Sequence, residues 1–165
     1  MSDRIDEIIA QWKRARPDLE TRAMALVGRI QRAAAVLRPR LEQTHAVSGL
    51  AGESFDVLAS LRRSGSPYQL SPTQLYREMM LTSGAMTNRI DRLEEAGLVA
   101  RRPDPSDRRA TLVRLTPEGK TLIDAAVMTH VANEERLLAG LNSRERQQLG
   151  DLLRKLLISL DDTGE

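Results

Sequence analysis

The sequence predicts a mainly α-helical fold with one small β-hairpin. Apolar residues recur at helical spacing along most of the 165 residues. Between residues 71 and 116, two short helices with capping signals precede two short strands joined by a turn. A bracing helix, a second helix and a hairpin in this order are typical of a winged helix-turn-helix, which reads double-stranded DNA. The remaining N- and C-terminal helices are expected to form a dimerisation region.

The N-terminal part is predicted to hold two helices. Residues 3–16 form the first, which ends before Pro17 because the residue before a proline avoids the helical conformation. Residues 19–41 form a long second helix, and Pro39 predicts a kink near its end. A loop is then expected over residues 45–52.

The central part is predicted to begin with a short helix over residues 53–63. Ser71 and Gln74 then form a capping box for the next helix, in which a side chain at each end of the motif satisfies a backbone N–H. This second short helix is the bracing helix of the predicted helix-turn-helix.

The recognition helix and the hairpin follow. Thr82 or Ser83 is expected to cap the recognition helix, and Gly97 supplies the left-handed residue that ends it. Residues 98–102 and 110–115 are predicted as strands, because turn-forming Pro, Asp and Ser residues separate them. These two strands form the wing.

Two helices are predicted after the wing. The first runs from residue 117 to about residue 139. Asn142 and Glu145 form another capping box, and the helix that they open carries a broad face of leucines.

These elements define three segments. Residues 1–50 hold the N-terminal helices, residues 53–116 form the DNA-binding domain and residues 117–165 form C-terminal dimerisation helices. The outer helices carry more Leu, Ile and Ala than the core of a small winged unit needs. They form either an intramolecular core or a region that interleaves with a second copy. A two-fold dimer places two recognition helices about 34–36 Å apart, on successive major grooves of a palindromic site.

Composition excludes several classes of protein. The chain has no cysteine, and His45 and His130 are isolated in the sequence, so neither a metal nor another cofactor is expected. No apolar run approaches the roughly 20 residues of a membrane span, and the N-terminus lacks a signal peptide. A soluble, cytoplasmic protein with no membrane partner is therefore expected. One Trp, two Tyr and one Phe are too few for single-strand stacking platforms, which favours duplex DNA.

The predicted recognition helix has one polar side. Thr87, Asn88 and Arg92 lie opposite its apolar stripe and suit base edges and phosphates. Ser83, at the start of the helix, suits a phosphate. A simple solvated helix face is the alternative, and the neighbouring wing favours DNA contact.

Arginines concentrate at the predicted wing. Arg108 and Arg109 lie at its tip, where an arginine enters a narrow minor groove with a strongly negative potential. Asp107 is positioned to hold one of them extended. A charge run is usually a solvated surface, but the place of this one between two strands favours binding.

The stretch LTSGAMTNRIDRLEEAGLVARRPDPSDRRATLVRLTPEGK closely resembles the multiple antibiotic resistance regulator (MarR) family. Its most specific part is DPSDRRATLVRLTPEG, which matches the family's wing and the start of its next helix. The flanking helices match in order and length. The resemblance implies a homodimeric winged-helix repressor or activator whose DNA affinity a small ligand changes. It also implies that Arg109 is the wing-tip arginine and Asp107 its partner.

The helix that carries Trp12 precedes the family's usual first helix and resembles the added helix of the urate-responsive, PecS-like regulators. That resemblance implies a ligand set, which consists of Trp12, Asp56, Arg89 and Arg101. An anionic, planar purine product such as urate would stack near Trp12 and accept hydrogen bonds from Arg89. Its charge would repel Asp56 and release Arg101.

The residues leave a second interpretation of these charges open. Arg89 lies on the packed side of its helix and Asp56 has apolar neighbours, so both need partners. A structural ion pair of Asp56 with Arg89 or with Arg101 would also satisfy them, and would orient the winged unit without any ligand.

The expected function is a ligand-responsive, homodimeric transcriptional repressor that urate or a related purine product releases from palindromic duplex DNA. Citrate-like carboxylates and phenolic compounds are alternatives for the effector. A non-specific architectural DNA-binding dimer is the alternative function. An enzyme is not expected, because no nucleophile arrangement, carboxylate pair or phosphate loop is apparent.

Overall fold

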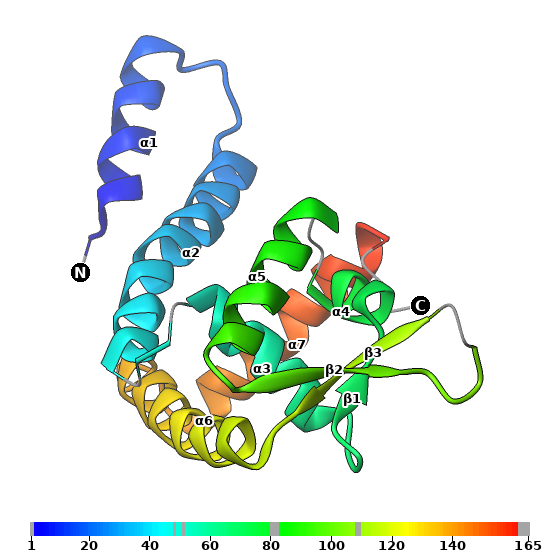
Figure 1. Cartoon of the computed structure of the whole chain (residues 1–165). Helices are drawn as coiled ribbons and strands as arrows, with labels where there is room; N and C mark the ends of the chain where they lie inside the picture. Colours follow the sequence, from blue (N-terminus) through cyan, green and yellow to red (C-terminus); the bar gives the residue numbers. More distant parts are fainter. Residues whose placement is uncertain (1, 48, 51, 80–82, 108–109, 162–165) are drawn as a thin grey trace. The chain divides into compact units, whose positions relative to one another are not determined.

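The computed structural model describes residues 2–47, 49–50, 52–79, 83–107 and 110–161, with the backbone alone for residues 83–85. The fold is mainly helical with one small antiparallel sheet, as the sequence predicts (Figure 1). The chain divides into two compact units, Met1–Gln43 and Thr44–Glu165. No helix in the described ranges is both long and apolar enough to cross a membrane.

The first unit consists of α1 (Arg4–Ala15) and most of α2 (Arg22–Val47). Asp3 caps α1, because its side chain accepts hydrogen bonds from two backbone N–H groups of the first turn. Arg29 of α2 donates to the Asp3 carboxylate at 2.7 Å, which links the two helices of this unit.

The helix α2 continues past Pro39, so the loop predicted from residue 45 begins too early. Tertiary packing holds the last turn: His45 is buried, and its ring stacks on Phe55 of α3 (Gly52–Arg63) with the ring centroids 4.0 Å apart. Packing of this kind extends a helix beyond the point where local sequence signals would end it.

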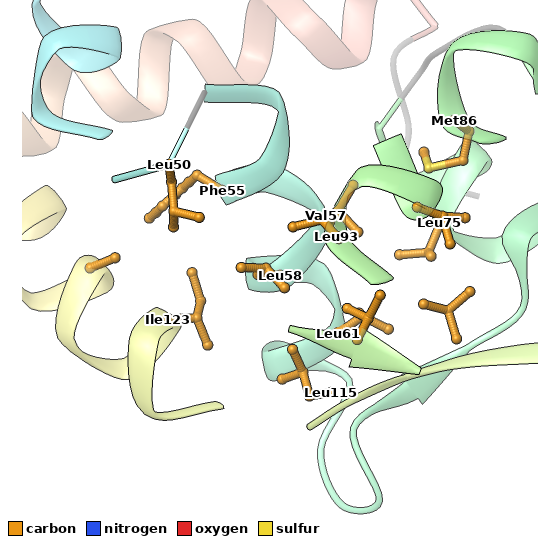
Figure 2. Packing of buried hydrophobic residues seen from close by; sticks show 14 residues of the cluster. Leu50, Phe55, Val57, Leu58, Leu61, Leu75, Met86, Leu93, Leu115 and Ile123 are labelled. Carbon is orange, nitrogen blue, oxygen red and sulfur yellow. The ribbon is translucent and has the colours of Figure 1, made fainter. Parts of the chain in front are cut away.

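The second unit is built around α3, in which Val57 and Leu61 are fully buried. Three helices surround it: α4 (Pro72–Met79), α5 (Ser83–Glu95) and α6 (Pro117–Leu137). Figure 2 shows Ile123 of α6 on one side of α3 and Leu75 and Met86, from α4 and α5, on the other. A single apolar cluster therefore positions the helix-turn-helix against the rest of the unit.

The sheet contains three strands: β1 (Gln69–Leu70), β2 (Val99–Pro103) and β3 (Thr111–Leu115). They pair antiparallel in the order β1-β3-β2, and β2 with β3 forms the predicted wing. The sequence did not predict β1, because two residues are too few to show the alternation of a strand. Its pairing of Gln69 with Arg114 covers the outer edge of β3.

Two of the predicted end signals of the helix-turn-helix are present in the described residues. The Ser71 N–H donates to Gln74 Oε1 at 2.8 Å, and the Gln74 N–H donates to Ser71 Oγ at 3.2 Å. Gly97 follows α5 with φ +70°, the left-handed conformation that the sequence predicted. The predicted cap at Thr82 or Ser83 lies outside the described side chains.

The start of α6 is fitted closely to the end of α5. Thr116 is the N-cap: its hydroxyl accepts the Gly119 N–H at 2.9 Å and donates to the Gly97 carbonyl at 2.8 Å. A Cβ on Gly119 would lie 1.9 Å from the carbonyl oxygen of Leu98. Only glycine fits this position without a shift of the backbone.

The last helix, α7 (Ser143–Ser159), begins with the predicted capping box of Asn142 and Glu145. All residues of α7 are described, and none of them is buried within the single chain. The exposed apolar side chains of α7 and its C-cap are Leu149, Leu152, Leu156, Leu157, Ile158 and Leu160.

Candidate nucleic-acid interface

The helix α5 has a buried side and an exposed side. Met86 and Leu93 are 2% and 3% exposed and pack in the core of the second unit. Thr87, Asn88 and Arg92 are exposed on the other side. Ser83 begins the helix, but its side chain lies outside the described residues. The arrangement offers one polar helix face of the size that enters a major groove.

An ion-pair clamp holds α5 against the wing. The Arg101 guanidinium donates to Asp91 at 2.5 Å and also to Glu94, and the Arg101 backbone N–H donates to Glu94 at 2.8 Å. The hydrogen bond to Asp91 is the main cause that raises the pKa of Arg101. The hydrogen bond from the Arg101 backbone N–H is the main cause that lowers the pKa of Glu94, and the bond from its guanidinium is the second. Three hydrogen bonds from one residue of β2 thus connect α5 to the wing.

The described residues that follow β2 make local hydrogen bonds. The Asp104 N–H donates to the Ala110 carbonyl at 3.0 Å, and the Asp104 carboxylate accepts from both the N–H and the hydroxyl of Ser106. Arg108 and Arg109, the predicted tip residues, lie outside the described residues, as does any bond from Asp107 to them.

The alternative interpretation, a structural ion pair of Asp56 with Arg89 or with Arg101, is not found within the described ranges. Arg89 donates instead to Glu53, with Nη2–Oε1 and Nε–Oε2 distances of 2.9 and 3.1 Å. Glu53 and Asp56 are about one helical turn apart on α3, and of these two carboxylates Glu53 forms the ion pair with Arg89. Arg101 pairs with Asp91 and Glu94, as described above, so an effector cannot release it from Asp56.

The carboxyl of Asp56 nevertheless lies in an unusual environment. The residue is exposed, yet the surrounding protein desolvates the carboxylate enough to raise its pKa. The charges of His45, Arg89 and His130 oppose this shift. Arg89 and Asp56 therefore lie within electrostatic range of each other, although they share no ion pair.

The sequence-predicted ligand residues fall in different units. Trp12 lies on α1 in the unit Met1–Gln43 and is 40% exposed. Asp56, Arg89 and Arg101 lie in the unit Thr44–Glu165. Of the Arg side chains, that of Arg89 is the more enclosed, at 12% exposure.

Sequence reasoning missed a pair of histidines. His45 Nε2 and His130 Nδ1 are 3.0 Å apart, and both rings pack against Phe55. His130 Nε2 lies 3.1 Å from Glu134. His45 and His130 are 85 residues apart in the chain, so no local pattern predicts their contact. Among the described residues, no group of three or more His, Cys, Asp or Glu is arranged to hold a metal.

The sequence is similar to those of known transcription regulators. A family model described as the MarR family matches residues 48–110. The chain is 36% identical over 152 residues to the HTH-type transcriptional regulator PecS of Dickeya dadantii, and the match covers 92% of each chain. A match of this length extends well beyond the winged unit.

Solved structures share the fold. A mutant of MarR from E. coli complexed with operator DNA has a TM-score of 0.72 and 27% identity, covering 85% of this chain and 99% of that one. BpsR of Bordetella bronchiseptica, whose DNA binding is regulated by 6-hydroxynicotinic acid, has a TM-score of 0.67 and 31% identity, covering 77% and 89%. The relatives are DNA-binding regulators and not enzymes, in agreement with the sequence prediction.

Proposed function

The chain belongs to the MarR family of DNA-binding transcription regulators, and from this premise we propose that it is a homodimeric repressor released from a palindromic operator by a small planar anion such as urate. The observation that carries the DNA-binding part is the two-sided α5, which buries Met86 and Leu93 and exposes Thr87, Asn88 and Arg92. The ligand part rests on the enclosed guanidinium of Arg89.

Residues 53–116 are proposed as the DNA-binding domain. The proposed DNA contacts are Ser83, Thr87, Asn88, Arg92, Arg108 and Arg109. Those on α5 read base edges and phosphates in the major groove, and those at the wing tip enter the minor groove. The ion pairs of Arg101 support this assignment, because they connect α5 to the wing.

Residues 1–50 and 117–165 are proposed as the dimerisation helices. The support is the apolar row of α7, which contains Leu149, Leu152 and Leu156 and is exposed in the single chain. A contiguous apolar surface of this kind is unfavourable in water and is typical of a protein interface. A second copy of the chain supplies a matching surface under two-fold symmetry.

Replacing Leu152 by glutamate is expected to convert the dimer to monomer, because two buried carboxylates would face the two-fold interface. Leu152 is 66% exposed in the single chain, so the fold of the monomer should survive. Sedimentation velocity at micromolar concentration measures the change. Gln147→Glu is the matched control, since Gln147 lies on the polar side beside Asp151. Equal sedimentation of the wild type and Leu152→Glu as dimers would exclude α7 from the interface.

The ligand is proposed to act through the contact between α3 and α5. Glu53 is 63% exposed, whereas Arg89 is 12% exposed, so the Glu53 carboxylate can move into solvent and a ligand anion can take its place at the enclosed guanidinium. Loss of the Glu53 contact frees α5 to tilt away from its DNA-binding angle. The ligand weakens DNA binding only by as much as it prefers the tilted state, and ~1–3 kcal/mol is a typical coupling.

The remaining members of the proposed ligand set have separate roles. Trp12 stacks on the planar ring. Asp56, whose pKa is raised, takes up a proton more readily as a second negative charge approaches Arg89. Arg101 passes the movement of α5 to the wing through Asp91 and Glu94.

Urate is expected to change the fluorescence of Trp12, the single tryptophan, with a saturable dependence on concentration. Arg89→Gln should weaken urate binding at least about tenfold, because a charge-assisted hydrogen bond is lost. Glu53→Gln should strengthen it, because a competing carboxylate is removed. Free tryptophan amide in the same solutions corrects for light absorbed by urate.

If saturating urate changes neither the emission nor the DNA affinity, urate is not the effector, and membership of the family is unaffected. The same titration with 6-hydroxynicotinate tests a second planar anion, which regulates the similar protein BpsR. Citrate and a neutral phenol complete the series and represent the carboxylate and phenolic alternatives.

A further inference from the structure

The outer face of the sheet, away from α5, carries a half-open cavity of about 370 Å³ that belongs to neither surface described above. We call it the Tyr68 cleft. Its main lining residues are Tyr68, Ala100, Arg102, Arg114, Pro117 and Lys120. Volumes of about 300–1,000 Å³ are typical of sites for small molecules. We propose that the Tyr68 cleft binds a small aromatic anion, at a site separate from Arg89.

The strand register brings the cations of the cleft together. Ala100 pairs with Arg114 and Arg102 pairs with Leu112, so Arg102 and Arg114 are diagonal neighbours on one face of the β2–β3 hairpin. Side chains in this relation are typically about 7–8 Å apart at Cα, within reach of a common ligand. Neither arginine has an ion pair in the part of the chain that the structure describes.

One lining residue of the cleft, Tyr68, is aromatic, and two cations lie near its ring. The Arg62 guanidinium carbon and Lys120 Nζ lie 5.0 and 5.8 Å from the centroid of the Tyr68 ring. Both also bind Asp124, at 2.6 and 2.9 Å, and these bonds lower the pKa of Asp124. Asp124 therefore offsets one of these two charges and leaves those of Arg102 and Arg114 uncompensated.

Tyr68 holds a backbone conformation that needs an explanation. Its φ is +61°, in the left-handed region that residues with a bulky side chain rarely adopt. Such strain is common at ligand sites, where the surrounding structure maintains it. The Tyr68 carbonyl accepts the Leu115 N–H at 3.1 Å, which anchors the residue to β3 with its ring in the cleft.

The chemistry of the lining selects among anions. Tyr68, Ala100 and Pro117 offer apolar and ring surface, which a flat aromatic ring covers and inorganic phosphate does not. Arg102 and Arg114 offer planar forks that match a carboxylate. The lining residues, all within the described ranges, include no Asp or Glu that would repel it.

The experiment uses 2-naphthoate as the probe and the full-length protein, followed by backbone amide NMR. We expect saturable shifts at Tyr68, Arg102 and Arg114 with a Kd on the order of 1 mM, as for other probes of this size. The neutral 2-naphthalenemethanol and inorganic phosphate should each bind at least about tenfold more weakly. Arg114→Gln should weaken naphthoate about tenfold. Arg144→Gln, an exposed arginine of α7, should have no effect.

Tyr68→Asn tests the ring, because asparagine tolerates the left-handed conformation. It should remove the preference for naphthoate over acetate. Arg89→Gln should leave naphthoate binding unchanged, so failure of the urate proposal and failure of this one are distinguishable. Equal binding of naphthoate and phosphate, displacement of naphthoate by duplex DNA, or unchanged affinity in Arg114→Gln would each overturn the proposal.

Discussion

Gly119→Ala is expected to lower the free energy of unfolding by about 3 kcal/mol, at the upper end of the range for added bulk in a packed site. The new Cβ would lie 1.9 Å from the carbonyl oxygen and 2.8 Å from the carbonyl carbon of Leu98. Both are backbone atoms, so no side-chain rotation relieves the clash. Leu98 also accepts the Thr116 N–H at 3.1 Å, and separation would stretch this bond. Urea denaturation followed by circular dichroism measures the change.

Gly150→Ala is the matched control for this substitution. Gly150 lies within α7, and a Cβ added there would meet no other part of the described chain within 4 Å, beyond its own turn of helix. Alanine should therefore stabilise the protein by ~0.5–1 kcal/mol through helix propensity alone. Both variants are compared at one protein concentration, because the stability of a dimer depends on concentration. A Gly119→Ala variant as stable as the wild type would show that α6 moves freely away from Leu98.

Asn88→Ala is expected to reduce the preference for operator over random duplex about tenfold or more, since a paired contact to a base edge contributes ~1–3 kcal/mol of discrimination. Asn88 is exposed on α5 between the turns that bury Met86 and Ile90, so its loss should not disturb the core. Selection from random duplexes first identifies the operator. Fluorescence anisotropy then measures both affinities for each variant.

Arg109→Ala should differ from Asn88→Ala in how the loss of affinity is distributed between operator and random duplex. An arginine at the wing tip interacts mainly with the potential of the minor groove, so operator and random duplex should weaken to a similar degree. The slope of log affinity against log salt concentration should also decrease in magnitude by about one. Arg144→Ala, on α7, controls for the loss of one positive charge. Equal losses on both duplexes from Asn88→Ala as well as Arg109→Ala would favour the architectural function instead.

Part of the candidate site was accessible from sequence because it depends on local periodicity. The side of α5 that Met86 and Leu93 bury follows from residues three and four apart, and so does the exposed side with Asn88. The caps at Ser71 and Asn142 also depend on residues only three apart. Patterns of this range are written in the sequence itself.

The partners of the charged residues were not accessible in the same way. Two carboxylates of α3, about one turn apart, were candidate partners of Arg89. The packing of α5 on α3 determines that Arg89 pairs with Glu53 and not with Asp56. Arg101 pairs with Asp91 and Glu94 of α5, which are 10 and 7 residues away in sequence. A long flexible side chain can reach several acceptors, and it pairs with the one that lies nearest. Distances between elements are set only when the chain folds.

The sequence by itself determined the mainly helical fold, the wing and the family, because helix caps, apolar faces and the motif around Asp104 are local features. Only the tertiary structure decided which residues separated in sequence meet. It joined His45 to His130 and paired the two-residue β1 with β3. It also assembled the Tyr68 cleft from β2, β3, the residue before β1 and the start of α6. These contacts depend on how preformed elements pack, and packing depends on shape across the whole core rather than on any single segment.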